Sequence, residues 1–299
     1  MPEPAVSART ERLPALIVMC VLVVAGVLVA TLGASRAPVT ASELLGEARD
    51  PGDAAFIAAH RGDSEGAPEN TMPAVRAAIA SGYEYVEVDI ALTADGHAVL
   101  MHDATVDRTT DGRGAVAEST LAQIRGLDAG SWFGPDFAGT PVPTAEEFLA
   151  ELASSSLRAL VELKGEWDAD SVASLVATIA RHGLERRVAV ASFDARTLAL
   201  VASQNTVISR LAILRQLPDD VVGAARALGV RGVIAAGREV LERPEVIDEL
   251  HAAGMRVVVY TFNDDGKWRE ALRAGVDGIV TDVPARLADW LSEEVSQPR

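Results

Sequence analysis

The chain has 299 residues, 49% hydrophobic and 23% charged, which is typical of a globular domain with an apolar addition and not of a disordered chain. Its formal net charge is −16. Residues 1–36 hold three Arg and two Glu, so the remainder carries 24 basic and 41 acidic side chains, a net −17. This excludes a nucleic-acid binder, which needs basic surface. The single cysteine, Cys20, excludes an internal disulfide, cysteine catalysis and a zinc–cysteine cluster.

The N-terminal region contains an uncharged apolar stretch, residues 13–32, that is long enough to cross a bilayer as one helix. Arg9 and Arg12 precede it and only Arg36 follows closely, which favours a cytoplasmic N-terminus, residues 1–12. A cleaved signal peptide is the alternative, but the length of the stretch favours a retained transmembrane anchor. We therefore expect a single-pass protein of the cell membrane with an extracytoplasmic domain, secreted if the segment is cleaved.

The rest of the chain divides into a small, polar, Pro/Gly-spaced linker (33–54), a folded domain (55–292) and a C-terminal tail (293–299). Within the domain, short apolar runs predict strands at 55–59, 84–90, 158–163, 187–192, 208–214, 231–235, 256–261 and 277–281. Helical patterns alternate with them at 72–81, 144–154, 169–182, 194–203, 218–228, 244–253, 265–274 and 285–292. Eight such pairs predict an α/β fold, a TIM-type (β/α)8 barrel. A doubly wound open sheet is the alternative, but no GxGxxG turn follows the first strand.

One segment, residues 91–143, is too long for a simple helical crossover. It contains a predicted hairpin that turns at Asp95-Gly96, and an aromatic loop at 131–135 that includes Trp132 and Phe133. Long loops in compact domains are usually functional or disordered.

Carboxylates lie on the inward faces of two predicted strands. Because side chains alternate along a strand, Glu87 and Asp89 share one face and the apolar residues between them take the other. The outer face of a barrel packs on helices, so these carboxylates point inward; Glu162 and Lys164 repeat the pattern. Three carboxylates form an all-oxygen set that suits Mg²⁺ or Ca²⁺ better than zinc. The alternative is a salt-bridge cluster with Lys164 and Arg61, although one Lys cannot balance three carboxylates.

Two histidines follow apolar runs at the ends where barrel enzymes carry their chemistry. His60 and Arg61 end the first predicted strand, and His102-Asp103 ends the run 98–101. Two imidazoles supply a base and an acid near neutral pH, while Arg61 and Lys164 provide fixed positive charge for a phosphate. The set predicts hydrolysis or transfer at an anionic phosphate ester.

Several motifs occur in order over residues 55–290: His60-Arg61-Gly62, Pro68-Glu69-Asn70-Thr71, Glu87-Val88-Asp89, His102-Asp103, Leu127-Asp128-Ala129-Gly130-Ser131-Trp132, Pro143-Thr144, Glu162-Leu163-Lys164, Ser192-Phe193-Asp194 and Gly275-Val276-Asp277-Gly278-Ile279-Val280-Thr281-Asp282, with Pro284. Together they resemble the glycerophosphodiester phosphodiesterase family. The resemblance implies a barrel that cleaves glycerophosphodiesters into glycerol 3-phosphate and an alcohol with the help of one divalent cation, Ca²⁺ or Mg²⁺.

By the same resemblance, the metal ligands are Glu87, Asp89 and Glu162, the acid–base pair is His60 and His102, and the phosphate contacts are Arg61 and Lys164. Glu69 borders the metal site of such proteins, as a ligand or as an acceptor beside one. Tyr260 stands where many members carry Trp, before Thr261-Phe262-Asn263, and we expect it and Trp132 to contact substrate.

Two other functions stay open at this point. The anchor and the Trp132-Phe133 loop allow a lysophospholipase D or a phospholipase-C-like enzyme that acts on longer lipids. A membrane-tethered, non-catalytic binding domain is the other, although the complete set of histidines and carboxylates argues against it. The sequence does not decide between Ca²⁺ and Mg²⁺, between water and the substrate's 2-hydroxyl as nucleophile, which histidine is the acid, or the oligomeric state.

Overall fold

The computed structural model describes residues 37–296. The predicted cytoplasmic segment 1–12, the predicted anchor 13–32 and residues 297–299 of the predicted tail lie outside the described residues. Among the helices of the described part, none combines the length and the apolar character that a membrane crossing requires.

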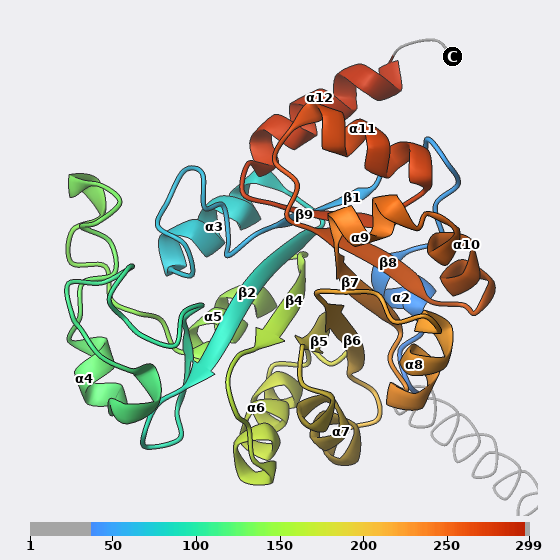
Figure 1. Cartoon of the computed structure of the whole chain (residues 1–299). Helices are drawn as coiled ribbons and strands as arrows, with labels where there is room; N and C mark the ends of the chain where they lie inside the picture. The colour runs from blue at the N-terminus through green and yellow to red at the C-terminus, as the bar shows by residue number, and fades with distance from the viewer. Residues whose placement is uncertain (1–36, 297–299) are drawn as a thin grey trace, which may run out of the picture. The chain divides into compact units, whose positions relative to one another are not determined.

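A closed barrel of eight parallel strands forms the domain, as predicted (Figure 1). The sheet runs in the order β1-β9-β8-β7-β6-β5-β4-β2, and pairing of β1 with β2 closes it. The strands are β1 (Phe56–Ala59), β2 (Tyr85–Leu92), β4 (Arg158–Leu163), β5 (Val188–Ser192), β6 (Ser209–Leu214), β7 (Gly232–Ala236), β8 (Arg256–Tyr260) and β9 (Gly278–Thr281). Each predicted strand is present: 158–163 matches β4 at both ends, and the others differ by one or two residues at one or both ends. Both faces of these strands are buried, which explains their nearly continuous apolar sequences.

Helices surround the barrel: α3 (Met72–Ser81), α5 (Ala145–Ala153), α6 (Ala169–Arg181), α7 (Ala195–Gln204), α8 (Val221–Leu228), α9 (Gly237–Glu242), α10 (Glu245–Ala252), α11 (Asp265–Ala274) and α12 (Pro284–Ser296). Thr144, Asp168, Asp194 and Asp264 cap α5, α6, α7 and α11 by accepting backbone N–H groups. Two details differ from prediction. The short α9 precedes α10, and α12 continues through residue 296 into the segment predicted as tail.

Most of the predicted linker is part of the barrel. A compact unit begins at Val39, and α2 (Ala41–Leu45) is held by a capping box between Thr40 and Glu43. Leu44 and Leu45 are buried against the side chains inside the barrel. The linker prediction is therefore wrong for residues 39–54: a five-residue helix is too short to show helical periodicity in a polar sequence.

The α2 segment closes the end of the barrel where the strands begin. Arg256, the first residue of β8, donates from Nε to the carbonyl of Gly46 at 2.9 Å. Tyr85, the first residue of β2, donates its hydroxyl to the carbonyl of Leu44. Substrate therefore has to approach from the opposite end, where the strands finish.

Residues 91–143 build a small appendage with its own core beside β2, on the left in Figure 1. The predicted hairpin is present: β3 (Ala98–Leu100) pairs antiparallel with β2, and the turn passes through Gly96 in the left-handed region. Val99, Val116 and Ile124, the last of these from α4 (Leu121–Arg125), are buried in the appendage core. This packing fixes the segment that follows β3, which carries His102.

Candidate active site

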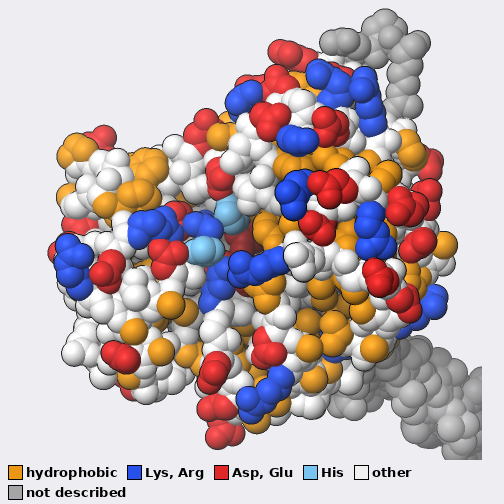
Figure 2. All heavy atoms as spheres, viewed as in Figure 1, with side chains coloured by type: hydrophobic (Ala, Val, Ile, Leu, Met, Phe, Trp, Pro, Cys, Tyr) orange, Lys and Arg blue, Asp and Glu red, His pale blue; other side chains and the backbone are white. Residues whose placement is uncertain are grey.

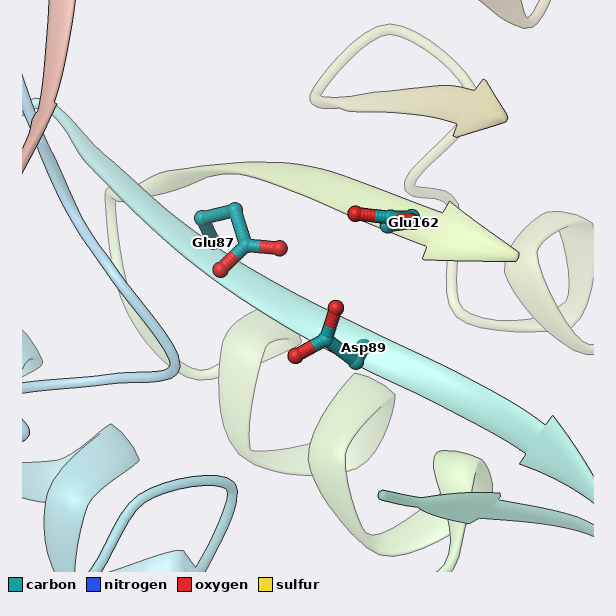
Figure 3. Close-up of side chains that lie close together, drawn as sticks. All are labelled: Glu87, Asp89 and Glu162. Atoms are coloured by element: carbon teal, nitrogen blue, oxygen red, sulfur yellow. The ribbon is translucent and has the colours of Figure 1, made fainter. Parts of the chain in front are cut away.

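Three carboxylates converge where β2 and β4 end inside the barrel. Figure 3 shows Glu87 and Asp89 on β2 and Glu162 on β4 turned toward one another. Asp89 is the register partner of Glu162 across the two strands, and one oxygen from each of the three residues lies within 4.8 Å of the others. Because side chains alternate along a strand, Glu87 and Asp89 face the barrel interior as predicted. Val86, Val88 and Ile90 take the opposite face and pack in the apolar core between the strands and the helices.

Burial and mutual repulsion disfavour the charged form of two of these carboxylates. Burial and the neighbouring Asp89 raise the pKa of Glu87 to about 8, and the same two causes raise the pKa of Glu162. Burial also acts on Asp89, but Lys164 and Arg61 outweigh it and hold its pKa below the usual value. The group thus carries more negative charge than its protein neighbours neutralise.

The salt-bridge alternative is realised only in part. Lys164 Nζ lies 3.2 Å from Asp89 Oδ1 and 2.7 Å from Glu162 Oε1, and Arg61 Nε lies 3.3 Å from Asp89 Oδ2. Asp89 Oδ1 and Glu162 Oε1 are buried and share the Lys164 ammonium between them. An all-oxygen set of three carboxylates with so few cationic partners fits a hard divalent cation.

The loop after β1 holds the carboxylates from one side. Arg61 and Gly62 both have a positive φ, and Gly62 is required because a Cβ there would lie 2.7 Å from the Ala74 backbone. In this conformation the Arg61 N–H donates to Glu87 Oε2 at 2.9 Å. Sequence reasoning did not assign Asn70 a role, yet its side chain donates to Asp89 Oδ2 at 2.9 Å and accepts from the Asp89 N–H at 3.1 Å.

His60 is held by an aspartate that sequence reasoning did not assign to the site. Its Nδ1 lies 2.5 Å from Asp282 Oδ1, and Asn263 donates to the other oxygen of Asp282 at 2.7 Å. Burial disfavours protonation of His60, but Asp282 and Glu87 outweigh it, so the pKa of His60 lies above its usual value. Asp282 belongs to the motif that ends the barrel, but no spacing rule links it to His60.

His102 has a comparable partner in its neighbour. Its Nδ1 lies 2.7 Å from Asp103 Oδ1, and Arg108 holds the other oxygen of Asp103 at 2.7 Å. Burial lowers the pKa of His102, and Arg61 and Lys164 add to that effect. Both histidines therefore use Nδ1 for orientation, which leaves Nε2 as the nitrogen that reaches a substrate.

Glu69 lies beside this site in an ion-pair network. Its Oε1 accepts from Arg61 at 2.8 Å, and Arg108 contacts both of its oxygens, at 2.7 and 2.8 Å. It does not belong to the close group formed by the three strand carboxylates. The geometry fits a role in positioning Arg61.

A cavity of about 260 Å³ joins these groups above the apolar interior of the barrel. It is lined by His60, Arg61, Glu87, His102, Glu162, Lys164 and Tyr260. The predicted contact of Tyr260 with substrate stays a prediction. Figure 2 shows the hollow, with histidine, Lys and Arg side chains around it and carboxylates deeper inside. Phe193 and Arg215 also line it. Phe193 belongs to the Ser192-Phe193-Asp194 motif but was given no role from the sequence, and Arg215 was not singled out.

Trp132 occupies a different place from the other predicted site residues. It is 43% exposed in the appendage, donates from Nε1 to the carbonyl of Ala129 at 2.9 Å, and packs edge-on against Phe133. It does not line the cavity between the two histidines. Its predicted contact with substrate stays a prediction.

Comparison with known proteins gives consistent matches. Residues 60–286 match the sequence model of the Glycerophosphoryl diester phosphodiesterase family. A glycerophosphodiester phosphodiesterase of Caldanaerobacter subterraneus is 33% identical over 234 residues, which are 78% of this chain and 96% of that protein.

Solved structures agree with this match. A phosphodiesterase from Oleispira antarctica in complex with the product sn-glycerol 3-phosphate superimposes with a TM-score of 0.71 at 26% identity, over 79% of this chain and 96% of that one. A putative glycerophosphoryl diester phosphodiesterase from Silicibacter pomeroyi gives a TM-score of 0.73 at 28% identity, over 84% of this chain and 97% of that one.

Proposed function

Because this chain belongs to the glycerophosphoryl diester phosphodiesterase family, we propose that it hydrolyses glycerophosphodiesters to glycerol 3-phosphate and an alcohol. The observation that carries this function is the convergence of two carboxylate-held histidines and a close group of three carboxylates at one cavity. The related Oleispira antarctica enzyme, solved with sn-glycerol 3-phosphate, supports a small glycerophosphate ligand. The protein is thus a phosphoric diester hydrolase.

The donor set supports one divalent cation, Ca²⁺ or Mg²⁺, held by Glu87, Asp89 and Glu162. When bound, such an ion supplies positive charge to the phosphate and to a reacting oxygen. Glu69, expected from sequence as a ligand or an acceptor beside one, is engaged by two arginines, and we assign it the positioning of Arg61.

The side chains of the cavity have complementary tasks. Arg61 and Lys164 bind the phosphate oxygens, which places phosphorus between the two histidines. One histidine takes the proton of the nucleophile as its oxygen bonds to phosphorus, and the other gives a proton to the alcohol oxygen as its bond to phosphorus breaks. The nucleophile is water, or the substrate's own 2-hydroxyl followed by hydrolysis of the cyclic phosphate.

The cellular location belongs to the same proposal. The apolar stretch 13–32 and the positive charges before it support a single-pass anchor in the cell membrane with the barrel outside the cytoplasm. A cleaved segment would instead release the barrel.

The function is tested with the purified full chain in the presence of Ca²⁺ or Mg²⁺. We expect release of equimolar glycerol 3-phosphate and choline from glycerophosphocholine, and little choline release from lysophosphatidylcholine. The reverse preference would identify a lysophospholipase D. Binding of glycerophosphocholine without turnover of either compound would identify the non-catalytic alternative.

A further inference from the structure

Arg215 is a cation in the active-site wall for which the proposed reaction has no task. It directly follows β6, at the catalytic end of the barrel, and its guanidinium stacks 4.4 Å from the centroid of the Phe193 ring. Within residues 37–296, its side chain forms no ion pair or hydrogen bond. A stacked, weakly hydrated guanidinium is well suited to hold an anion.

The carboxylates of the first cavity have cationic partners other than Arg215. Arg61 and Lys164 contact Asp89, and Lys164 contacts Glu162, while the proposed divalent cation would offset the rest of this group. The surrounding acidic groups already have partners: Asp282 pairs with His60, Asp103 with His102 and Arg108, and Glu69 with Arg61 and Arg108. Within residues 37–296 no acidic side chain pairs with Arg215, so its positive charge is available to a negative group of the substrate.

A second cavity, of about 580 Å³, adjoins the first. The two cavities share His102, Lys164 and Arg215 as lining residues. Its remaining wall comes from the appendage, including Leu92 and Val116, and from the loop after β4, including Glu166.

The position of the second cavity allows it to receive one of the two substituents on the phosphorus atom of the substrate. A phosphodiester carries two substituents on phosphorus. With the phosphate at Lys164 and the glycerol half beside the carboxylates of the first cavity, the other substituent extends past His102 into the second.

We propose that the second cavity binds the leaving alcohol of the diester and that Arg215 selects alcohols that carry an anionic group such as a carboxylate. This rests on the proposed function. Glu166 lines the same cavity and forms no ion pair within the described residues, so an alcohol with both an ammonium and a carboxylate, as in serine, matches both charges. Arg215 is in this view a specificity-determining residue.

Two substrates that differ by one carboxylate test the proposal: glycerophosphoserine and glycerophosphoethanolamine. The full chain and its Arg215→Gln variant are compared by kcat/KM for glycerol 3-phosphate release. We expect the serine-to-ethanolamine ratio of kcat/KM to fall at least about tenfold in Arg215→Gln, which corresponds to the loss of one charge-assisted hydrogen bond to the carboxylate that only the serine substrate carries. Arg238→Gln, at an exposed α9 residue outside both cavities, should alter neither value.

Glu166→Gln provides a control within the same cavity. Both substrates carry the ammonium group, so this variant should lower both kcat/KM values alike and leave their ratio unchanged. A ratio that does not change in Arg215→Gln, or equal losses for both substrates, would overturn the proposal.

Measurements of substrate binding test the role of Arg215 independently of whether the protein catalyses the proposed reaction. In a His60→Ala background with Ca²⁺ or Mg²⁺ present, calorimetry measures binding of both diesters with or without Arg215→Gln. The expected tenfold loss is confined to glycerophosphoserine and does not depend on turnover. Equal affinities before and after the change would reject the role of Arg215 even for an active enzyme.

Discussion

At the scale of single residues, the Asp282–His60 contact makes the clearest prediction. Asp282→Asn keeps the shape of the side chain but removes the charge next to Nδ1, and we expect kcat to fall about ten- to a hundredfold. Asp282 contributes to the raised pKa of His60, so its loss lowers that pKa. The part of the kcat–pH profile that depends on the ionisation of His60 should therefore shift to lower pH.

The pH profile distinguishes this role from a general loss of stability. Asp265→Asn, at an exposed aspartate that pairs with Arg286, is the matched control and should leave both kcat and the profile unchanged. A reduced kcat in Asp282→Asn with an unshifted pH profile would mean that Asp282 does not act through His60.

Glu162 makes a prediction about the metal. Glu162→Gln removes one of three converging carboxylates, so the divalent-cation concentration for half-maximal activity should rise at least about tenfold. The metal-free variant should melt at a higher temperature than the metal-free wild type, since like-charge repulsion is relieved. Glu249→Gln, on the exposed face of α10, should change neither property. An unchanged metal requirement in Glu162→Gln would remove Glu162 from the ligand set.

Sequence patterns predict some of these residues better than others. Glu87, Asp89 and Glu162 are predictable because an inward carboxylate in an otherwise apolar strand is conspicuous. Asn70 and Asp282 act through neighbours from other elements, and Arg215 stacks on Phe193 of another element. Only the folded barrel brings these residues together.

At the scale of elements, α2 should contribute to stability and not to chemistry. Leu44 is fully buried at the end of the barrel opposite the site, so Leu44→Ala should cost about 2–5 kcal/mol in unfolding free energy. That corresponds to a fall in Tm of about 5 °C or more, with kcat unchanged at low temperature. Glu47→Ala, whose side chain is 86% exposed in the same segment, should shift Tm only slightly. A loss of kcat in folded Leu44→Ala would contradict this separation.

The elements differ in how visible they are in sequence. Strands and long helices of the barrel are visible because burial imposes apolar runs and helical periodicity on them. α2 spans five residues and α9 six, and such short helices have too few turns to show a period. The prediction ended α12 at residue 292 because the charged residues Glu293 and Glu294 come next and resemble a tail in sequence.

At the scale of the whole molecule, the predicted anchor calls for a cellular test. The full chain, expressed with a C-terminal tag, should stay with the membrane pellet through a high-salt wash and be released by detergent. A variant that lacks residues 1–36 should remain in the supernatant and retain activity, because the compact unit starts at Val39. A shortened form of the tagged chain in the extracellular medium would show cleavage instead.

The central claim is that the carboxylates and histidines at the barrel mouth perform metal-dependent diester hydrolysis. The most direct measurement strips the purified protein with a chelator and follows glycerol 3-phosphate release from glycerophosphocholine while Ca²⁺ or Mg²⁺ is added back. We predict no release from the stripped protein and saturable recovery with one of the two ions, which also names the cation. Full activity after stripping, or no release with either ion, would contradict the account.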